Sequence, residues 1–98
     1  MSSRRPDPLA QVSDFEIRLL KLFRSVVECG GFSAAESALG IGRSAISQQM
    51  SDLEQRIGLR LCQRGRAGFA LTEEGREVYQ STLQLLAALE SFRTEVNG

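Results

Sequence analysis

The sequence predicts one mainly α-helical domain, with a three-helix core, a two-stranded hairpin and a long C-terminal helix. Four segments carry apolar residues at the spacing of an amphipathic helix. Glycines follow the first three of these segments, as they do where helices end. Only the region after Gly58 changes to the alternating pattern of strands. With 98 residues, 42% of them hydrophobic, the chain has the size and composition of a single globular domain.

The first helix is expected over about Asp14–Cys29, after a flexible N-terminal tail that covers residues 1–12. The tail is polar, carries both prolines and has little to bury. Ser13 and Glu16 have the spacing of a capping box at the start of the helix. The apolar residues that recur at helical spacing are Phe15, Leu19, Leu22, Phe23, Val26 and Val27.

The second helix is expected to begin at Ser33, because Ser33 and Glu36 form another capping box. It is short and ends at Gly40. We predict that its buried side chains are Ala35, Ala38 and Leu39.

The third helix is expected over about Arg43–Ile57, with Gly58 as its stop. A turn that contains glycine separates it from the second helix, which is typical of a helix-turn-helix. Its apolar positions, at spacings of four, three and four, are Ile46, Met50, Leu53 and Ile57.

A hairpin is expected next, since Leu59, Leu61, Phe69 and Leu71 alternate with other residues on either side of a basic tip over 64–68. Together with the preceding helices, this hairpin predicts a winged helix-turn-helix over residues 13–72.

The last helix is expected over residues 73–98, with Thr72 as its N-cap. Glu73 and Glu74 stand in its first turn, where the helix dipole favours anions. Its apolar positions alternate at four and three residues, the pattern of a helix that pairs with another helix. We therefore predict a homodimer interface formed by Val78, Thr82, Leu85, Leu89, Phe92 and Val96.

The net charge of zero hides a separation of charge along the chain. Residues 43–66 carry +3, because five arginines stand there against Asp52 and Glu54. Residues 73–98 carry −3. A solvated charge run is the usual interpretation of such a segment. Here, however, the arginines flank a helix whose outer face is small and polar, which favours a surface for an anionic partner.

The composition argues against an enzyme. The chain has no histidine, so it cannot form a Ser-His-Asp or Cys-His site by itself. The commonest metal ligand is missing for the same reason. We expect no catalytic activity, no metal and no cofactor.

Cys29 and Cys62 are expected to be free thiols, because neither belongs to a CxxC pair and a disulfide scaffold of this size would need more cysteines. Residues 1–13 lack the apolar core of a signal peptide, and no apolar run is long enough to span a membrane. These features predict a cytoplasmic protein with no membrane partner.

The outer face of the third helix is the strongest functional signal. Ser and Gln are unusual there, because solvated helices usually carry Glu, Lys and Arg. Gln can pair with an adenine edge, Arg with a guanine edge, and Ser with either bases or phosphates. A merely soluble polar face explains any one of these residues, but explains the set less well. We predict that the base-contacting residues are Arg43, Ser44, Ser47 and Gln48, at the start of the helix, with Ser51 further along the same row.

Other residues are predicted to contact the DNA backbone. Arg64 and Arg66 lie at the hairpin tip, where they can reach phosphates or a minor groove. Ser33 can offer its amide and hydroxyl to a phosphate at the start of a helix, besides its role as a cap. Gln49, next to Gln48, completes this predicted set.

The sequence resembles a known family in several stretches whose order and spacing together are specific. It is similar to the N-terminal winged helix-turn-helix domain of LysR-type transcriptional regulators. The stretches that carry the resemblance are 32–39, 44–50, 53–58 and 71–75, with Leu61 and Arg64.

The resemblance implies a winged helix that reads double-stranded DNA as a dimer, with the last helix as the linker that pairs between subunits. It also implies base contacts from four residues of the third helix and phosphate contacts from the wing. The base contacts are Arg43, Ser44, Ser47 and Gln48, and the wing contacts are Arg64 and Arg66. Such regulators carry a large effector-sensing domain, so we expect either part of a longer regulator or a stand-alone domain, with no effector site in these residues. Gly42 stands where the family often has a capping Ser, and Cys62 where a Phe is usual.

Two alternatives stay open from the sequence. One is a helical homodimerisation or protein-interaction module, which would have no need of the Ser/Gln face or the arginine tip. The other is the similar DNA-binding domain of a molybdate-responsive regulator.

Overall fold

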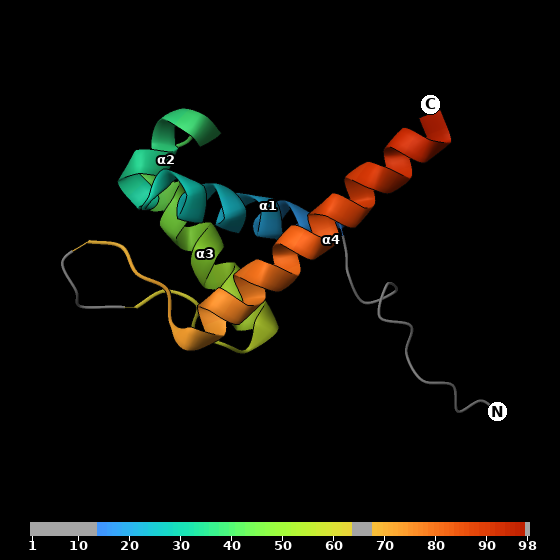
Figure 1. Ribbon diagram of the computed structural model, residues 1–98. Helices are drawn as coiled ribbons and strands as arrows, with labels where there is room; N and C mark the ends of the chain where they lie inside the picture. Colours follow the sequence, from blue (N-terminus) through green and yellow to red (C-terminus); the bar gives the residue numbers. More distant parts are fainter. Residues whose placement is uncertain (1–13, 64–67, 98) are drawn as a thin grey trace.

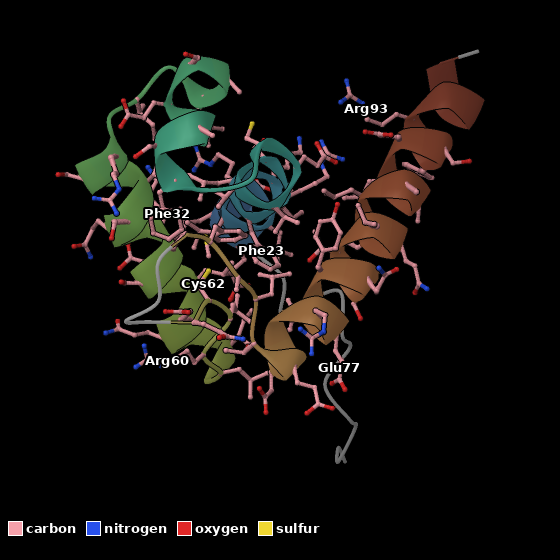
Figure 2. The ribbon with its side chains drawn as sticks, turned by 60° about the vertical axis from the view of Figure 1, so that its left-hand side comes forward. Phe23, Phe32, Arg60, Cys62, Glu77 and Arg93 are labelled. Atoms are coloured by element: carbon pink, nitrogen blue, oxygen red, sulfur yellow. The ribbon has the colours of Figure 1, made fainter. Side chains whose placement is uncertain are left out.

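A computed structural model describes residues 14–63 and 68–97 of the chain. Four helices make up most of this part: α1 (Asp14–Cys29), α2 (Phe32–Leu39), α3 (Arg43–Ile57) and α4 (Glu73–Asn97). Helices α1, α2 and α3 pack together, whereas α4 lies along α1 and its last turns stand clear of the other helices (Figures 1 and 2). The bounds of α1 and α3 agree with those predicted.

The core forms around α1, which contacts each of the other helices. Its residues Leu19, Phe23 and Val26 are fully buried, and Leu22 is nearly so. They recur at three and four residues, so they share one face of the helix. The partners of these residues in the core are Ala35 of α2, Ile46, Met50 and Leu53 of α3, and Leu61 and Cys62 beyond it.

The N-cap of helix α2 lies two residues earlier than predicted. Gly31 is its N-cap and no side chain caps it, so the predicted capping role of Ser33 is wrong. The amide of Gly31 instead donates to Val26 O (3.0 Å), which turns the chain directly out of α1. Phe32 can then begin the helix while its ring packs against Phe69, with 6.1 Å between ring centroids.

The buried stripe of α2 is narrower than predicted. Ala35 is fully buried and Leu39 is half-buried, whereas Ala38 is exposed. An eight-residue helix makes only two turns, and here Phe32, Ala35 and Leu39 supply the whole stripe that faces the core.

Helix α3 ends as expected at Gly58, whose φ of 82° lies in the left-handed region and whose amide donates to Glu54 O (2.8 Å). Ile57 was predicted to belong to the buried face, but it is 37% exposed because it is the last residue of the helix. Leu59, which follows the cap and begins the predicted alternation of the hairpin, is 41% exposed.

The hairpin that follows is antiparallel at its base. Cys62 and Leu71 form a β-bridge, and Gln63 N donates to Ala70 O (2.9 Å). Thr72 N donates to Leu61 O (2.9 Å) one step further down. The arginines predicted for the tip, Arg64 and Arg66, lie outside the described residues.

Leu61 and Cys62 are both buried, although strict alternation would bury only one of them. The reason lies in α3, since Glu54 Oε2 accepts hydrogen bonds from Leu61 N (2.8 Å) and Cys62 N (3.2 Å). These bonds hold this side of the hairpin base against α3. Figure 2 accordingly shows Cys62 inside the molecule, between α3 and the hairpin.

Helix α4 begins as predicted, with the hydroxyl of Thr72 accepting a hydrogen bond from Gly75 N (2.8 Å). It packs on α1 through Tyr79, whose ring meets that of Phe23 edge-on at 6.1 Å. Helices α2 and α3 with the hairpin beside them form a winged helix-turn-helix, and α4 is its C-terminal extension.

Candidate nucleic-acid interface

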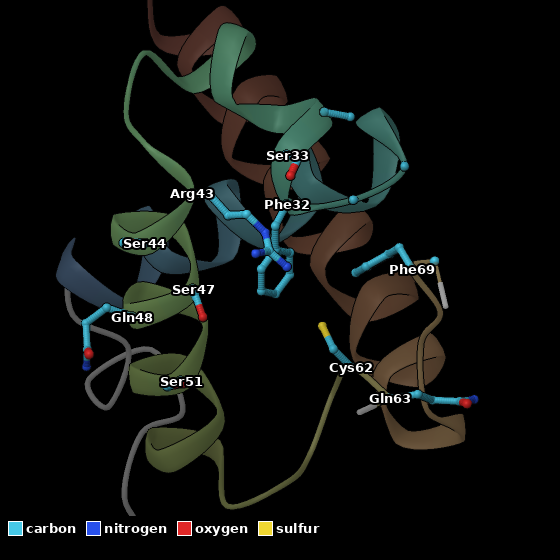
Figure 3. Close-up of a pocket in the computed structure, with 14 residues that line it drawn as sticks. Phe32, Ser33, Arg43, Ser44, Ser47, Gln48, Ser51, Cys62, Gln63 and Phe69 are labelled. Atoms are coloured by element: carbon cyan, nitrogen blue, oxygen red, sulfur yellow. The ribbon is translucent and has the colours of Figure 1, made fainter. Parts of the chain in front are cut away.

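A groove of about 850 Å³ opens between the start of α2, the outer face of α3 and the hairpin (Figure 3). Four of the predicted base-contacting residues line it from α3, and Ser33 lines it from α2. All five are exposed. The structure therefore brings onto one surface the residues Ser33, Arg43, Ser44, Ser47 and Gln48.

Two helices begin at this groove. Residues of the first turns of both α2 and α3 line it, and neither N-cap, Gly31 or Gly42, offers a side chain to the free amides. The Gly42 observation agrees with the expectation that α3 lacks a capping hydroxyl. First-turn amides without a side-chain partner carry partial positive charge and attract anions. The groove thus has two positive helix ends on its wall.

The charged side chain in the groove is positive, like the two helix ends. Among the described residues that line the groove, Arg43 is the one with a charged side chain, and no carboxylate joins it. Figure 3 shows its side chain pointing into the groove from the start of α3. The groove suits an anionic partner that offers hydrogen-bonding edges to Ser and Gln.

The remaining predicted contacts lie elsewhere. Gln49 is half-buried and does not line the groove. Gln63 and Gly68, the described residues on either side of 64–67, line the groove at its hairpin edge.

Several residues that line the groove are not among those predicted from the sequence. Gln63 donates from Nε2 to Leu71 O (2.9 Å), which ties the two sides of the hairpin together next to the groove. Phe32 and Phe69 form its apolar floor through their ring contact. Gln63 directly precedes the basic tip, which was a usable signal, but the pairing of the two rings depends on contacts between distant segments.

The described residues of the predicted homodimer interface on α4 fall into two groups. Val78 packs on the core and Thr82 is 2% exposed, with its hydroxyl donating to Val78 O (2.7 Å). These two residues are covered by their own chain. Leu85 and Leu89 are half-buried, and Phe92 is 62% exposed.

Both cysteines are free thiols, with Cys29 half-buried and Cys62 buried. Within 14–63 and 68–97, no group of acidic, cysteine or histidine residues could hold a metal ion. No helix in the described part of the chain has the length and apolarity needed to cross a bilayer.

Comparison with known proteins gives consistent results. The chain is 69% identical over 97 residues to the HTH-type transcriptional activator BauR of Pseudomonas aeruginosa, which covers 99% of this chain and 32% of BauR. The chain therefore spans about a third of the length of that relative.

Solved structures resemble the fold closely. The BenM_DBD/benA site 1 DNA complex superposes with a TM-score of 0.79 at 31% identity, covering 83% of this chain and 91% of that one. The CbnR_DBD–DNA complex superposes with a TM-score of 0.70 at 30% identity, covering 83% and 95%. Residues 17–76 match the model of one family, which favours that family over the molybdate-responsive regulators. The chain belongs to the bacterial regulatory helix-turn-helix proteins of the lysR family.

Proposed function

We propose that this chain is the DNA-binding domain of a LysR-type transcriptional regulator and that it binds double-stranded DNA sequence-specifically as a homodimer. The observation that carries the proposal is the groove, where Arg43, Ser47 and Gln48 stand beside the free starts of two helices. The two superposed structures are DNA complexes, which supports the same function here.

Different parts of the domain are assigned to base contacts and to phosphate contacts. Helix α3 enters the major groove, whose width admits a helix, with Arg43, Ser44, Ser47 and Gln48 towards the base edges. The start of α2, with Ser33, meets a phosphate through its amides and hydroxyl. Base contacts supply specificity, whereas phosphate contacts supply affinity and register.

Additional backbone contacts come from the hairpin and from the flank of α3. Arg64 and Arg66 at the tip, together with Gln49 beside the groove, are proposed to contact the DNA backbone. The positive charge of residues 43–66 supports this arrangement, since neutralised phosphates release counterions.

Dimerisation is proposed through the free part of α4. Leu85, Leu89 and Phe92 leave an apolar strip on a helix whose end stands clear of the rest of the domain (Figure 1). Val96 continues the strip at the same spacing. A second copy would cover it and place two α3 helices on half-sites about one helical turn or more apart.

The whole regulator is proposed to work in the cytoplasm, where its DNA is. The name of BauR, a transcriptional activator, supports control of transcription as the process. No catalytic role is proposed, since the family is one of regulatory proteins.

The test begins with selection of binding sites from random duplex DNA by the 98-residue chain. Gln48→Ala should then lower the affinity for the selected site by about 1–3 kcal/mol, the usual contribution of a base contact, and change the affinity for random DNA much less. Binding is measured by fluorescence anisotropy at a fixed salt concentration. Equal losses on both DNAs would contradict the assigned role of Gln48, and failure to select any sequence would contradict the proposed function.

A further inference from the structure

Gln48 is held by a neighbour on its own helix. Its Nε2 donates a hydrogen bond to Asp52 Oδ1 at 3.2 Å. The two residues are four apart, so their side chains lie on the same face of α3. Gln48 lines the groove, whereas Asp52 is half-buried just outside it, one turn closer to the end of the helix.

This hydrogen bond selects one orientation of the Gln48 side chain. A carboxamide has an oxygen that accepts and a nitrogen that donates, and a free Gln can turn to present either. The carboxylate of Asp52 can only accept, so it keeps the nitrogen of Gln48 on its own side. The oxygen Oε1 and the second N–H of Gln48 stay available to a partner.

That orientation suits some base edges and not others. In the major groove, adenine offers a donor at N6 beside an acceptor at N7, which matches the free oxygen and N–H of a carboxamide. Guanine offers only acceptors, at O6 and N7. A Gln whose oxygen faces outward meets an acceptor there, whereas a Gln free to turn could donate to guanine.

We propose that Asp52 is a positioning residue that sets base specificity: it holds the Gln48 carboxamide with its oxygen free towards the DNA, which favours a base edge that pairs a hydrogen-bond donor with an acceptor, and so adenine over guanine. The inference rests on the proposed DNA-binding function. Asp52 acts through Gln48 and does not itself contact a base.

A purely structural role makes a different prediction. Gln–Asp pairs four residues apart also stabilise helices. A pair with that role alone would change the melting temperature of the domain and leave the preference between bases unchanged. The ratio of two DNA affinities therefore separates the two roles.

The experiment is a double-mutant cycle on DNA. Sites selected from random duplexes by the wild-type chain and by Gln48→Ala identify the base pair that Gln48 reads, since its preference disappears in the variant. Affinities are then measured for the selected duplex with adenine or guanine at that position. The proteins are the wild type, Asp52→Asn, Gln48→Ala and the double variant.

Asp52→Asn is nearly isosteric, but an Asn amide can bond either end of the Gln48 carboxamide. We expect it to lower the adenine-over-guanine ratio by about 3- to 10-fold, part of the discrimination that a bidentate contact supplies. In the Gln48→Ala background the same substitution should leave the ratio unchanged. Loss of the Asp52 charge should also raise the affinity for all duplexes alike, which cancels in the ratio.

Glu28→Gln is the control for charge, because Glu28 is an exposed carboxylate two residues before Gly30, which lines the groove. It should leave the ratio unchanged. The inference is overturned if Asp52→Asn keeps the ratio of the wild type, if it changes the ratio equally with and without Gln48, or if Gln48→Ala alters the preference at no position. Failure of the wild-type chain to select any sequence would instead overturn the proposed function itself.

Discussion

Single residues fix how the hairpin attaches to the helices, and Gly75 is the clearest case. The first turn of α4 passes so close to Leu61 that a Cβ built on Gly75 would lie 2.9 Å from the Leu61 carbonyl carbon and closer still to its oxygen. Both partners are rigid, since Gly75 is helical and Leu61 O accepts a hydrogen bond from Thr72 N. Only glycine permits this approach.

Gly75→Ala should therefore destabilise the domain, although alanine normally stabilises a helix relative to glycine. We expect a loss of about 1–3 kcal/mol, the usual range for overpacking of a rigid site. Urea unfolding followed by circular dichroism measures it. Gln80→Ala is the control, because Gln80 is an exposed residue of the same helix and its replacement should change stability little. A stability of Gly75→Ala equal to or above that of the wild type would contradict the tight approach.

Glu54 is the second residue that ties the hairpin down, through its bonds to the amides of Leu61 and Cys62. Glu54→Ala should cost about 1–3 kcal/mol of unfolding free energy, because it leaves two part-buried amides without this acceptor. Glu54→Gln keeps an oxygen acceptor and should lose less. The same unfolding assay measures both variants. Equal losses would contradict the stabilising role of an acceptor oxygen at this position.

At the scale of the elements, the groove joins two helix starts to one hairpin. The tip of the hairpin is flanked by Gln63 and Gly68, which line the groove. An arginine between these two residues in the sequence would add positive charge to the proposed DNA interface. Its contribution should be affinity without sequence preference, because phosphates are the same at every base pair.

Arg64→Ala should accordingly weaken binding to selected and random DNA by similar factors. It should also reduce the slope of log affinity against log salt by about 1, as expected for one lost phosphate contact. Salt titrations with both DNAs measure the effect. A loss confined to the selected site would instead indicate that Arg64 reads sequence.

Sequence patterns predicted which segments form helices, but they predicted the ends of these helices less accurately. The bounds of α1 and α3 were predicted because their apolar residues keep a regular period over four turns. The predicted N-cap of α2 is two residues too late, since the amide of Gly31 bonds back to α1 and no capping side chain is needed. Ile57 continues the apolar period of α3 but is exposed, because the period does not show that the helix ends at this residue.

At the scale of the whole molecule, positive and negative charge lie on different elements, and exposed apolar residues gather towards the end of α4. The positive segment 43–66 belongs to α3 and the hairpin, and the negative segment 73–98 belongs to α4. The part of the predicted homodimer interface that lies near the core is covered by the chain itself, as the burial of Thr82 demonstrates. Further along, Phe92 is largely exposed on a helix end that stands clear of the body (Figure 2).

Leu89→Glu should therefore shift a dimer towards the monomer, because a carboxylate within an apolar helix pair must be desolvated. Sedimentation at tens of micromolar should give the mass of two chains for the wild type and a lower mass for the variant. Gln84→Glu adds the same charge at an exposed position outside the strip and should leave the mass unchanged. A wild-type mass of one chain, or an unchanged mass in Leu89→Glu, would count against pairing through α4.

The sequence by itself determined the number of helices, most of their bounds, and the polar face of α3, because these depend on periodicity and on residue types within single segments. Only the tertiary structure decided which of those residues share a groove, that Leu61 and Cys62 are both buried, and that Val78 and Thr82 belong to the core of their own chain. These outcomes depend on contacts between segments far apart in the chain. A one-dimensional pattern specifies which face of a helix is apolar, but it does not specify what covers that face.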